Sequence, residues 1–185
     1  MLSRLSQLVL AGSLILSAGF AAKKDHNDAF TAGAPDENRI AREVRHRLVM
    51  LPYYGAFDDL AFKVEAGTIT LMGAVTRPVL KSDAENVVKR IEGVTQVVNE
   101  IKVLPPSPMD DQIRRALYRA IYGDPALSTR YGFRAVPSMH IIVDNGRVTL
   151  EGVVANEMDK NLCNLRANGV PNVFSVTNDL RVEDR

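Results

Sequence analysis

Cysteine and tryptophan are nearly absent from this sequence, whose 185 residues include one cysteine, Cys163, and no tryptophan. A single thiol cannot close an intramolecular disulfide, so side-chain packing must hold the fold together. Aromatic residues make up only 6% of the chain, which argues against stacking platforms for nucleic-acid bases or sugars. The formal net charge is +1, so no overall field favours nucleic acid or an anionic membrane. We therefore expect no nucleic-acid partner, and electrostatic binding would need a local patch.

Long apolar runs are also absent, because the apolar stretch at residues 8–16 is shorter than the roughly 20 residues that span a bilayer. It follows Arg4 and precedes several small residues, which is the pattern of a secretory signal. We therefore predict a signal peptide over residues 1–21, a flexible leader over residues 22–35, and a periplasmic protein without a transmembrane helix once the signal is removed. A retained N-terminal anchor is the alternative. Since no cysteine follows the small residues, we do not expect a lipoprotein.

The chain contains an internal duplication with a shift of 79 positions. This shift places residues 67–73 (GTITLMG) over 146–152 (GRVTLEG), and residues 97–103 (VVNEIKV) over 176–182 (VTNDLRV). Across the 37 aligned positions, 10 are identical, and no gap is needed. The period exceeds that of the common solenoid repeats, so each copy is expected to be a small domain.

Residues 105–108 contain three prolines in four positions and separate the two copies. Such a segment favours a stiff, extended linker. We define module 1 as residues 36–104 and module 2 as residues 109–185.

Hydrophobic periodicity predicts the order α-β-β-α-β within each module. In module 1, the first helix is expected to begin near Asp36 and the second to be capped by Thr76. In module 2 the expected caps are Ser107, with Pro108 at the first helical position, and Asn156. The predicted fold class is α+β, with two modules that each have a three-stranded sheet and two helices packed on one face. The other sheet face is expected to contact water, because it carries polar side chains at Lys63, Thr70, Glu100 and Lys102.

The order of these motifs resembles the BON domain of bacterial envelope proteins: a helix, Gly-x-hydrophobic-Thr-Leu-x-Gly, a second helix, and Val-x-Asn-acid-hydrophobic-x-Val. Both modules match, so the resemblance covers nearly all of the chain after the leader. It implies a non-enzymatic role in envelope maintenance or stress response, and one group of two-BON proteins is associated with anionic phospholipid. The lipidated cysteine of that group is missing here. Module 2 also departs from module 1 between Gly123 and Val136, where its loop is six residues longer.

The repeated glycines and asparagines are interpreted first as structural residues. The glycines are expected at turns and close helix–sheet approaches, because a phosphate-binding loop would need a more glycine-rich turn. The asparagines face the apolar side of the last strand, where the amide must be hydrogen-bonded, and ligand contact is the alternative. These residues are Gly67, Gly73, Gly146, Gly152, Asn99 and Asn178.

The first helix of each module offers the candidate binding site. Arginine and tyrosine on an outer helix face suit phospholipid headgroups, since the charge attracts phosphate and the ring suits the interface. An ordinary solvated helix face is the alternative. The candidate residues are Arg114, Arg115, Tyr118, Arg119 and Tyr122 in module 2, and Arg42 and Arg45 in module 1.

Other functions have weaker support. A protein-interaction or chaperone-like module would use the open sheet faces, with an exposed apolar patch around Ile142 and Val98. We expect no enzyme, metal site or cofactor, because paired carboxylates, a nucleophile–base set or a metal cluster cannot be assembled from the motifs. Cys163 is expected in the core as a small apolar residue.

Overall fold

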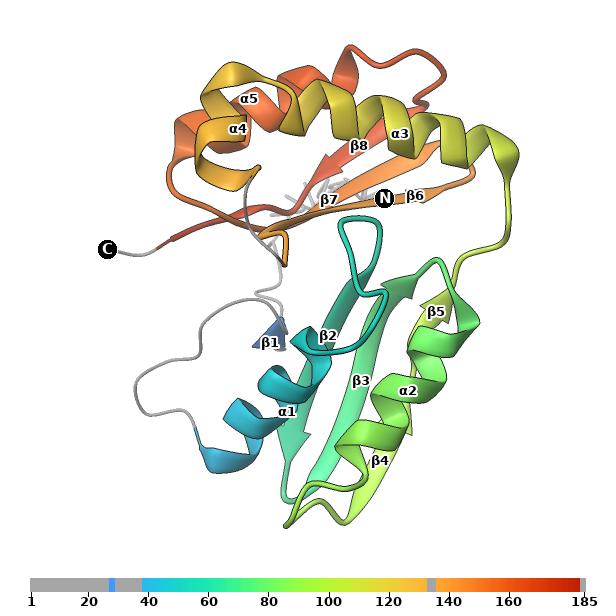
Figure 1. Cartoon of the computed structure of the whole chain (residues 1–185), viewed down its shortest axis with the longest axis vertical. Coiled ribbons are helices and arrows are strands. Elements are labelled where there is room, and N and C mark those ends of the chain that lie inside the picture. Colours follow the sequence, from blue (N-terminus) through green and yellow to red (C-terminus); the bar gives the residue numbers. More distant parts are fainter. Residues whose placement is uncertain (1–26, 29–37, 133–135, 184–185) are drawn as a thin grey trace, which may run out of the picture.

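The computed structural model describes residues 27–28, 38–132 and 136–183, which form two modules, one above the other in Figure 1. The predicted signal peptide and most of the predicted leader lie outside the described residues. Two leader residues, Asn27 and Asp28, form a short strand opposite Phe62 and Ala61. These two residues of the predicted flexible leader belong to a strand that the sequence did not predict.

The helices and strands follow the predicted order in both modules. Strand β1 (Asn27–Asp28) belongs to the leader and pairs with module 1, which contains α1 (Arg39–Val49), β2 (Asp59–Glu65), β3 (Thr68–Val75), α2 (Pro78–Val88), β4 (Gln96–Asn99) and β5 (Lys102–Val103). Module 2 contains α3 (Pro108–Tyr122), α4 (Pro125–Tyr131), β6 (Met139–Asp144), β7 (Arg147–Val154), α5 (Glu157–Asn168), β8 (Ser175–Asn178) and β9 (Arg181–Val182). The added helix α4 occupies part of the longer loop of module 2.

The sheet register repeats with the 79-residue shift. β2 and β3 form an antiparallel hairpin, and β4 pairs in parallel with β3, with Thr68 opposite Gln96. β6, β7 and β8 are arranged in the same way, with Arg147 opposite Ser175. The last strand of each module is interrupted and resumes as β5 or β9, which pairs with the same central strand. The α+β class and the α-β-β-α-β order are confirmed.

Each module has its own apolar core between the helices and one sheet face. Phe62 and Leu71 are fully buried in module 1, and Ile141 and Leu117 are fully buried in module 2. In Figure 1, α1 and α2 lie in front of the module 1 sheet, whereas α3 and α5 lie above the module 2 sheet. The two helical layers therefore do not share one plane.

Two of the three predicted helix caps are confirmed. Ser107 accepts a hydrogen bond from the Asp110 amide, and Asn156 accepts one from the Asp159 amide. The first helix of module 1 begins later than expected, after Asn38 rather than near Asp36. The prediction for Thr76 was wrong, because both its amide and its hydroxyl donate to the Asp58 carboxylate.

The modules pack against each other, in addition to being joined by the proline linker. The Ile141 amide of β6 donates to the Ala56 carbonyl of module 1 over 2.7 Å. Phe57 packs against the core of module 2, and Val136, its equivalent 79 positions later, packs against the core of module 1. The contact is therefore reciprocal, with the same loop of each module reaching the other core.

His140 lies at this contact and is fully buried. Its Nδ1 atom is 3.1 Å from the Gly55 carbonyl oxygen, and its ring stacks on Tyr54 with 5.3 Å between ring centroids. Burial lowers the pKa of His140 to about 4, so the ring is neutral at physiological pH.

Candidate functional site

Arg114 does not lie on the outer face of α3, so its predicted position there was wrong. It is only 4% exposed, and its guanidinium donates to the Val143 carbonyl over 2.6 Å. A second hydrogen bond, also 2.6 Å, joins it to the Asp111 carboxylate. A long side chain at the margin of the helix face can bend inward when a strand carbonyl is in reach, and Val143 at the end of β6 supplies that acceptor.

Tyr122 is also directed toward the core, contrary to its predicted place on the outer face. Its ring is 7% exposed, and its hydroxyl donates to the Met139 carbonyl over 2.5 Å. Burial raises the pKa of the Tyr122 hydroxyl, which therefore remains a donor. This hydroxyl ties the last turn of α3 to the first residue of β6.

Of the predicted α3 contacts, Arg115, Tyr118 and Arg119 are exposed, and Asp111 and Gln112 are exposed on the same helix. Tyr118 stacks on Tyr122 and meets Phe57 edge-on at 6.0 Å, so one side of its ring lies against the module contact. Arg119 lines a shallow hollow of about 380 Å³ between α3, α4 and α5. The side chain of Leu165 in the same hollow is 66% exposed, which places an apolar group beside the arginine.

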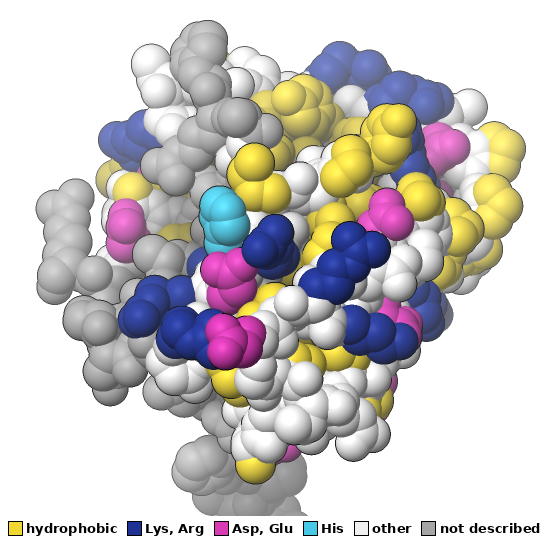
Figure 2. All heavy atoms as spheres, turned by 60° about the horizontal axis from the view of Figure 1, so that its bottom comes forward, with side chains coloured by type: hydrophobic (Ala, Val, Ile, Leu, Met, Phe, Trp, Pro, Cys, Tyr) yellow, Lys and Arg dark blue, Asp and Glu magenta, His cyan; other side chains and the backbone are white. Residues whose placement is uncertain are grey.

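Helix α1 presents the more basic face. Arg42, His46 and Arg47 are exposed, while Arg45 is half-buried and its guanidinium lies 5.6 Å from the Phe62 ring centre. Arg47 forms an ion pair with Glu43 one turn away. On the face drawn in Figure 2, Lys and Arg side chains occur in small groups with acidic side chains beside several of them, and they do not form one continuous basic patch.

Gly73 and Gly152 lie where two segments of the backbone approach each other closely. Their φ angles are +104° and +117°, a region that favours glycine. A Cβ atom at Gly73 would lie 2.3 Å from the Asp59 carbonyl oxygen, and one at Gly152 would lie 2.2 Å from the Ser138 carbonyl oxygen. Gly67 and Gly146 occupy the second loop position of the two hairpins, with φ of +86° and +74°.

Asn99 and Asn178 make equivalent hydrogen bonds in the two modules. The Asn99 amide donates to the Lys81 carbonyl over 2.9 Å, and its oxygen accepts from the Ile101 amide. The Asn178 amide donates to the Lys160 carbonyl over 2.9 Å, and its oxygen accepts from the Leu180 amide. Each asparagine thus joins the second helix to the break in the last strand, a geometry that suits the structural interpretation.

The ionic contacts that hold α4 were not anticipated from the sequence. Asp159 is 2% exposed, accepts from Arg130 over 2.6 Å, and accepts from the Tyr131 hydroxyl over 2.6 Å. Arg166 pairs with Asp124 at the start of α4. No spacing rule could have found these pairs, because α4 lies in the loop without a counterpart in module 1.

The open sheet faces give little support to an exposed apolar patch. Ile142 is only 8% exposed and Val98 is half-buried, so neither supplies the exposed apolar patch that would favour a protein-interaction module. Cys163 is buried in the core, and burial raises its pKa to about 12. In the part of the chain that the structure describes, no helix is long and apolar enough to cross a membrane, and no three His, Cys, Asp or Glu side chains are grouped to hold a metal.

Comparisons with known proteins agree with the repeated architecture. Osmotically-inducible protein Y of Escherichia coli (strain K12) is 27% identical over 132 residues, which cover 68% of this chain and 62% of that protein. The match thus spans less than two thirds of the relative. Two structures of CdsD, a structural protein of the Type III secretion system of Chlamydia trachomatis, give TM-scores of 0.32 and 0.30 at 12% identity. They cover 80% and 78% of this chain, and 100% and 93% of those chains, but TM-scores this low do not establish a shared fold.

The family assignment rests on the two modules themselves. The BON domain model matches residues 36–105 and again residues 110–184. These matches coincide with the two copies of the α-β-β-α-β unit and with their shared glycines and asparagines. The chain therefore belongs to the BON-domain family, as a tandem BON protein similar to osmotically-inducible protein Y.

Proposed function

We propose that this chain is an exported, non-enzymatic protein of the periplasm that serves the cell envelope in osmotic stress and binds anionic phospholipid weakly. The similarity to osmotically-inducible protein Y supports the stress role, and the signal pattern of residues 1–21 supports export. The lipid part depends on the exposed arginines of α1 and α3.

The basic face of α1 is the observation that carries the lipid proposal. The helix contains four arginines and one glutamate, whose charges sum to +3. Helix α3 contains three arginines and two aspartates, which sum to +1, and one of those arginines is buried. The main contact is therefore proposed at Arg42, Arg45 and Arg47, with Arg115, Tyr118 and Arg119 as the weaker second surface.

The expected binding is weak and sensitive to salt. Each basic side chain near an anionic surface contributes about 1 kcal/mol, and screening reduces this at moderate ionic strength. Removing two exposed arginines should therefore weaken binding by about 2 kcal/mol, or roughly 30-fold. Because the two helical layers do not share a plane, simultaneous contact of both faces with one flat bilayer is not part of the proposal.

Co-sedimentation with vesicles tests the proposal directly. The chain is mixed with phosphatidylglycerol-containing or pure phosphatidylcholine vesicles, at low and moderate salt. One variant carries Arg42→Gln and Arg47→Gln on α1, and another carries Arg115→Gln and Arg119→Gln on α3. A third, Lys89→Gln with Arg90→Gln after α2, removes the same charge from a different surface and is the matched control.

Salt-sensitive binding to the anionic vesicles, reduced most by the α1 pair and unchanged by the control pair, supports the proposal. Equal losses in all three variants would indicate unspecific charge attraction. No binding to either vesicle would remove the lipid proposal, and leave the stress and envelope parts to a protein partner. Charge changes at Arg114 are unsuitable for this test, because that side chain is buried and its loss would perturb folding.

A further inference from the structure

Helix α5 carries an apolar stripe that faces the solvent. Met158, Leu162 and Leu165 are four and three residues apart, so they lie on one side of the helix. The first is 78% exposed and the last 66%, while Leu162 is half-buried against the core of module 2. A different side of the helix, which carries Cys163 and Ala167, faces that core. Two large apolar side chains therefore stay uncovered after module 2 has folded.

The stripe is not part of the plan that the two modules share. With the 79-residue shift, Leu162 corresponds to Asp83. Leu165 corresponds to the exposed Asn86, and only the first position keeps an apolar side chain, Val79. A BON module therefore folds with polar residues at the two leucine positions. Exposed apolar groups that folding does not require are typical of a protein-binding surface.

Guanidinium groups border the stripe on the side of α4. Arg130 of α4 pairs with Asp159 of α5 over 2.6 Å. Arg166 of α5 pairs with Asp124 at the start of α4 over 2.7 Å. Both carboxylates are buried, whereas the two arginine side chains are about half exposed. The solvent therefore meets the positive end of each pair, and each guanidinium keeps N–H donors for a second carboxylate.

The hollow between α3, α4 and α5 adjoins one end of the stripe. Arg119, Leu165 and Arg166 line its volume of about 380 Å³. Among the described residues Arg119 has no ion-pair partner, so its charge is available to a ligand. In Figure 1 these three helices cover the side of the module 2 sheet that faces away from module 1, so the hollow lies outside the module contact.

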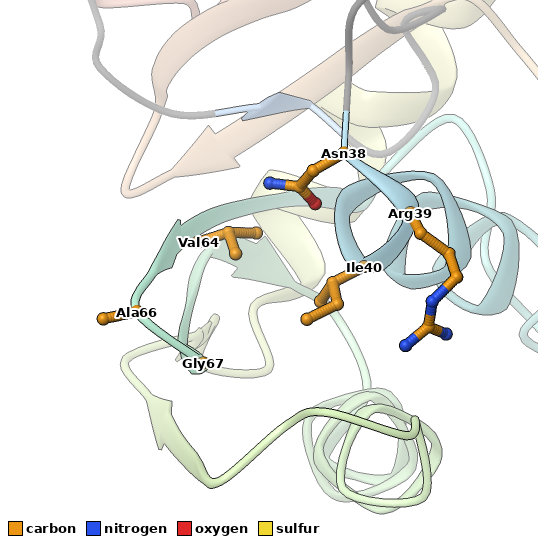
Figure 3. A pocket seen from close by; sticks show the side chains of 6 residues that line it. All are labelled: Asn38, Arg39, Ile40, Val64, Ala66 and Gly67. Atoms are coloured by element: carbon orange, nitrogen blue, oxygen red, sulfur yellow. The ribbon is translucent and has the colours of Figure 1, made fainter.

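Module 1 has a pocket of comparable volume, about 430 Å³, with different chemistry. It lies between the start of α1 and the Ala66–Gly67 turn, and Figure 3 shows that its arginine, Arg39, points away from that turn. The Arg39 guanidinium donates to the Glu92 carbonyl over 2.8 Å. The combination of an apolar helical stripe and half-exposed arginines is therefore a feature of module 2.

We infer that module 2 binds an amphipathic helix of a partner protein, with acidic residues flanking its apolar side. The apolar side would cover the stripe, whose seven-residue span corresponds to about 10 Å, or two helical turns. The flanking carboxylates would meet the guanidinium groups, because solvent meets the positive and not the negative end of each ion pair. We call this surface the α5 groove, and it consists of Met158, Leu162, Leu165, Arg119, Arg130 and Arg166.

Charge and shape favour this occupant over two others. A bilayer is flat and contacts protruding groups, whereas Leu165 and Arg119 line a hollow. A second copy presenting the same groove would bring further guanidinium groups but no exposed carboxylate from it. The groove is also separate from the main lipid contact proposed on α1.

Fluorescence anisotropy with the full chain and three labelled peptides of about 15 residues tests this inference. The first two peptides place leucines at the i, i+3, i+4 and i+7 positions of a helix, flanked by glutamates in one and by lysines in the other. The third has the composition of the acidic peptide with its leucines dispersed. We expect saturable, salt-sensitive binding of the acidic peptide, roughly tenfold tighter than that of the other two.

A pair of variants tests the apolar stripe. Met158→Gln with Leu165→Asn removes the two exposed apolar side chains and should raise the dissociation constant roughly tenfold or more. Val79→Gln with Met109→Gln removes exposed apolar groups from other helices, so it should leave the constant within about twofold. All four positions are exposed, so thermal unfolding followed by circular dichroism should be unchanged in both variants.

A second pair of variants tests the charge. Arg119→Gln should raise the dissociation constant roughly threefold and reduce its dependence on salt. Arg115→Gln, on the same helix but outside the lining of the hollow, should leave both unchanged. Arg130 and Arg166 are unsuitable for this test, because their loss would leave buried carboxylates unpaired.

Each alternative occupant has its own result. The inference is overturned if the acidic peptide shows no saturable binding up to about 1 mM, or if the basic peptide binds equally. Unchanged binding in the Met158/Leu165 variant also overturns it. Without peptide binding, self-association in sedimentation equilibrium that this variant abolishes would assign the groove to a second copy. Vesicle binding that this variant abolishes would assign it to the membrane, and either result overturns the helical partner.

The proposed lipid function can fail independently of the α5 groove. Arg42→Gln with Arg47→Gln should weaken vesicle binding and leave peptide binding unchanged. Peptide binding without vesicle binding would remove only the lipid proposal, and vesicle binding without peptide binding would remove only the helical partner.

Discussion

The two BON domains share their backbone plan but differ in what they place on it. Gly73 and Gly152 make the same close approach, and Asn99 and Asn178 make the same helix–strand bridge. At the hairpin turn of module 2, the Asp110 carboxylate accepts from both turn amides, and among the described residues of module 1 an open pocket lies beside the equivalent turn. The repeat therefore preserves residues that satisfy backbone constraints, whereas side chains on helix faces and at module ends have diverged. Function is best sought where the modules differ.

Replacing the glycines that make the same close backbone approach in both modules should have the largest effect on stability. The effect should be equal in the two modules. Gly73→Ala and Gly152→Ala each place a Cβ atom within 2.3 Å of a carbonyl oxygen at positive φ. We expect each to lower the free energy of unfolding by about 4 kcal/mol, measured by urea denaturation. Gly169→Ala, where the added atom meets nothing nearer than an oxygen at 3.6 Å, is the control and should change the free energy of unfolding by less than about 1 kcal/mol. Unequal losses at the two equivalent glycines would contradict the shared plan.

The next prediction concerns a residue that differs between the modules, since His140 of module 2 occupies the position of Ala61 in module 1. It predicts how stability depends on pH. The folded pKa of His140, about 4, lies below the ordinary value of 6.5. Above pH 6.5 the ring is neutral in both states; below it, only the unfolded state gains the proton, so stability falls until the pH reaches the folded pKa. The loss over this window should be about 3 kcal/mol.

Thermal or urea unfolding from pH 7 to pH 4 measures this loss, and His140→Ala is the informative variant. It should be less stable at pH 7 but lose less on acidification, because its unfolded state no longer gains an imidazole proton below pH 6.5. An unchanged pH profile in this variant would mean that another group controls the acid response.

The neighbouring residues Arg114 and Arg115 differ in role, because Arg114 is buried and hydrogen-bonded whereas Arg115 is exposed. Arg114→Met removes a buried donor to the Val143 carbonyl and should cost about 2 kcal/mol of unfolding free energy. Arg115→Met, on the exposed face, should change stability by less than about 0.5 kcal/mol. Denaturation of the two variants in parallel tests the assignment, which fails if their stabilities are equal.

The smallest predicted effect concerns the second helix of each module. Asn156 caps α5, and its equivalent 79 positions earlier is Arg77, which makes no side-chain cap in the described structure. Asn156→Ala should therefore lower the unfolding free energy by about 1 kcal/mol, and Arg77→Ala by a few tenths. A larger loss at Arg77 would indicate that its contact with the Tyr53 ring, 4.9 Å away, contributes more to stability than its position at the helix start.

Much of the fold could be predicted because its determinants are local. The alternation of apolar residues, the Asn-Gly hairpin and the Ser107-Pro108 helix start act within a few residues, and each is found in the structure. The error at Thr76 has a tertiary cause, since the Asp58 carboxylate of the preceding loop accepts both of its hydrogen bonds. Helical periodicity also placed Arg114 and Tyr122 outside, because a wheel diagram does not show which strand carbonyls are within reach.

The sequence by itself determined the duplication, the order of elements and the positions where only glycine fits, because these depend on short-range sterics repeated at a fixed interval. Tertiary structure alone decided the module contact, in which Ala56 meets Ile141 and Gly55 meets His140. It also decided that the Asp110 carboxylate accepts hydrogen bonds from the turn amides of module 2. These features join residues that are distant in the chain, and their energies depend on burial and hydrogen-bond geometry, which arise only when the modules have folded together.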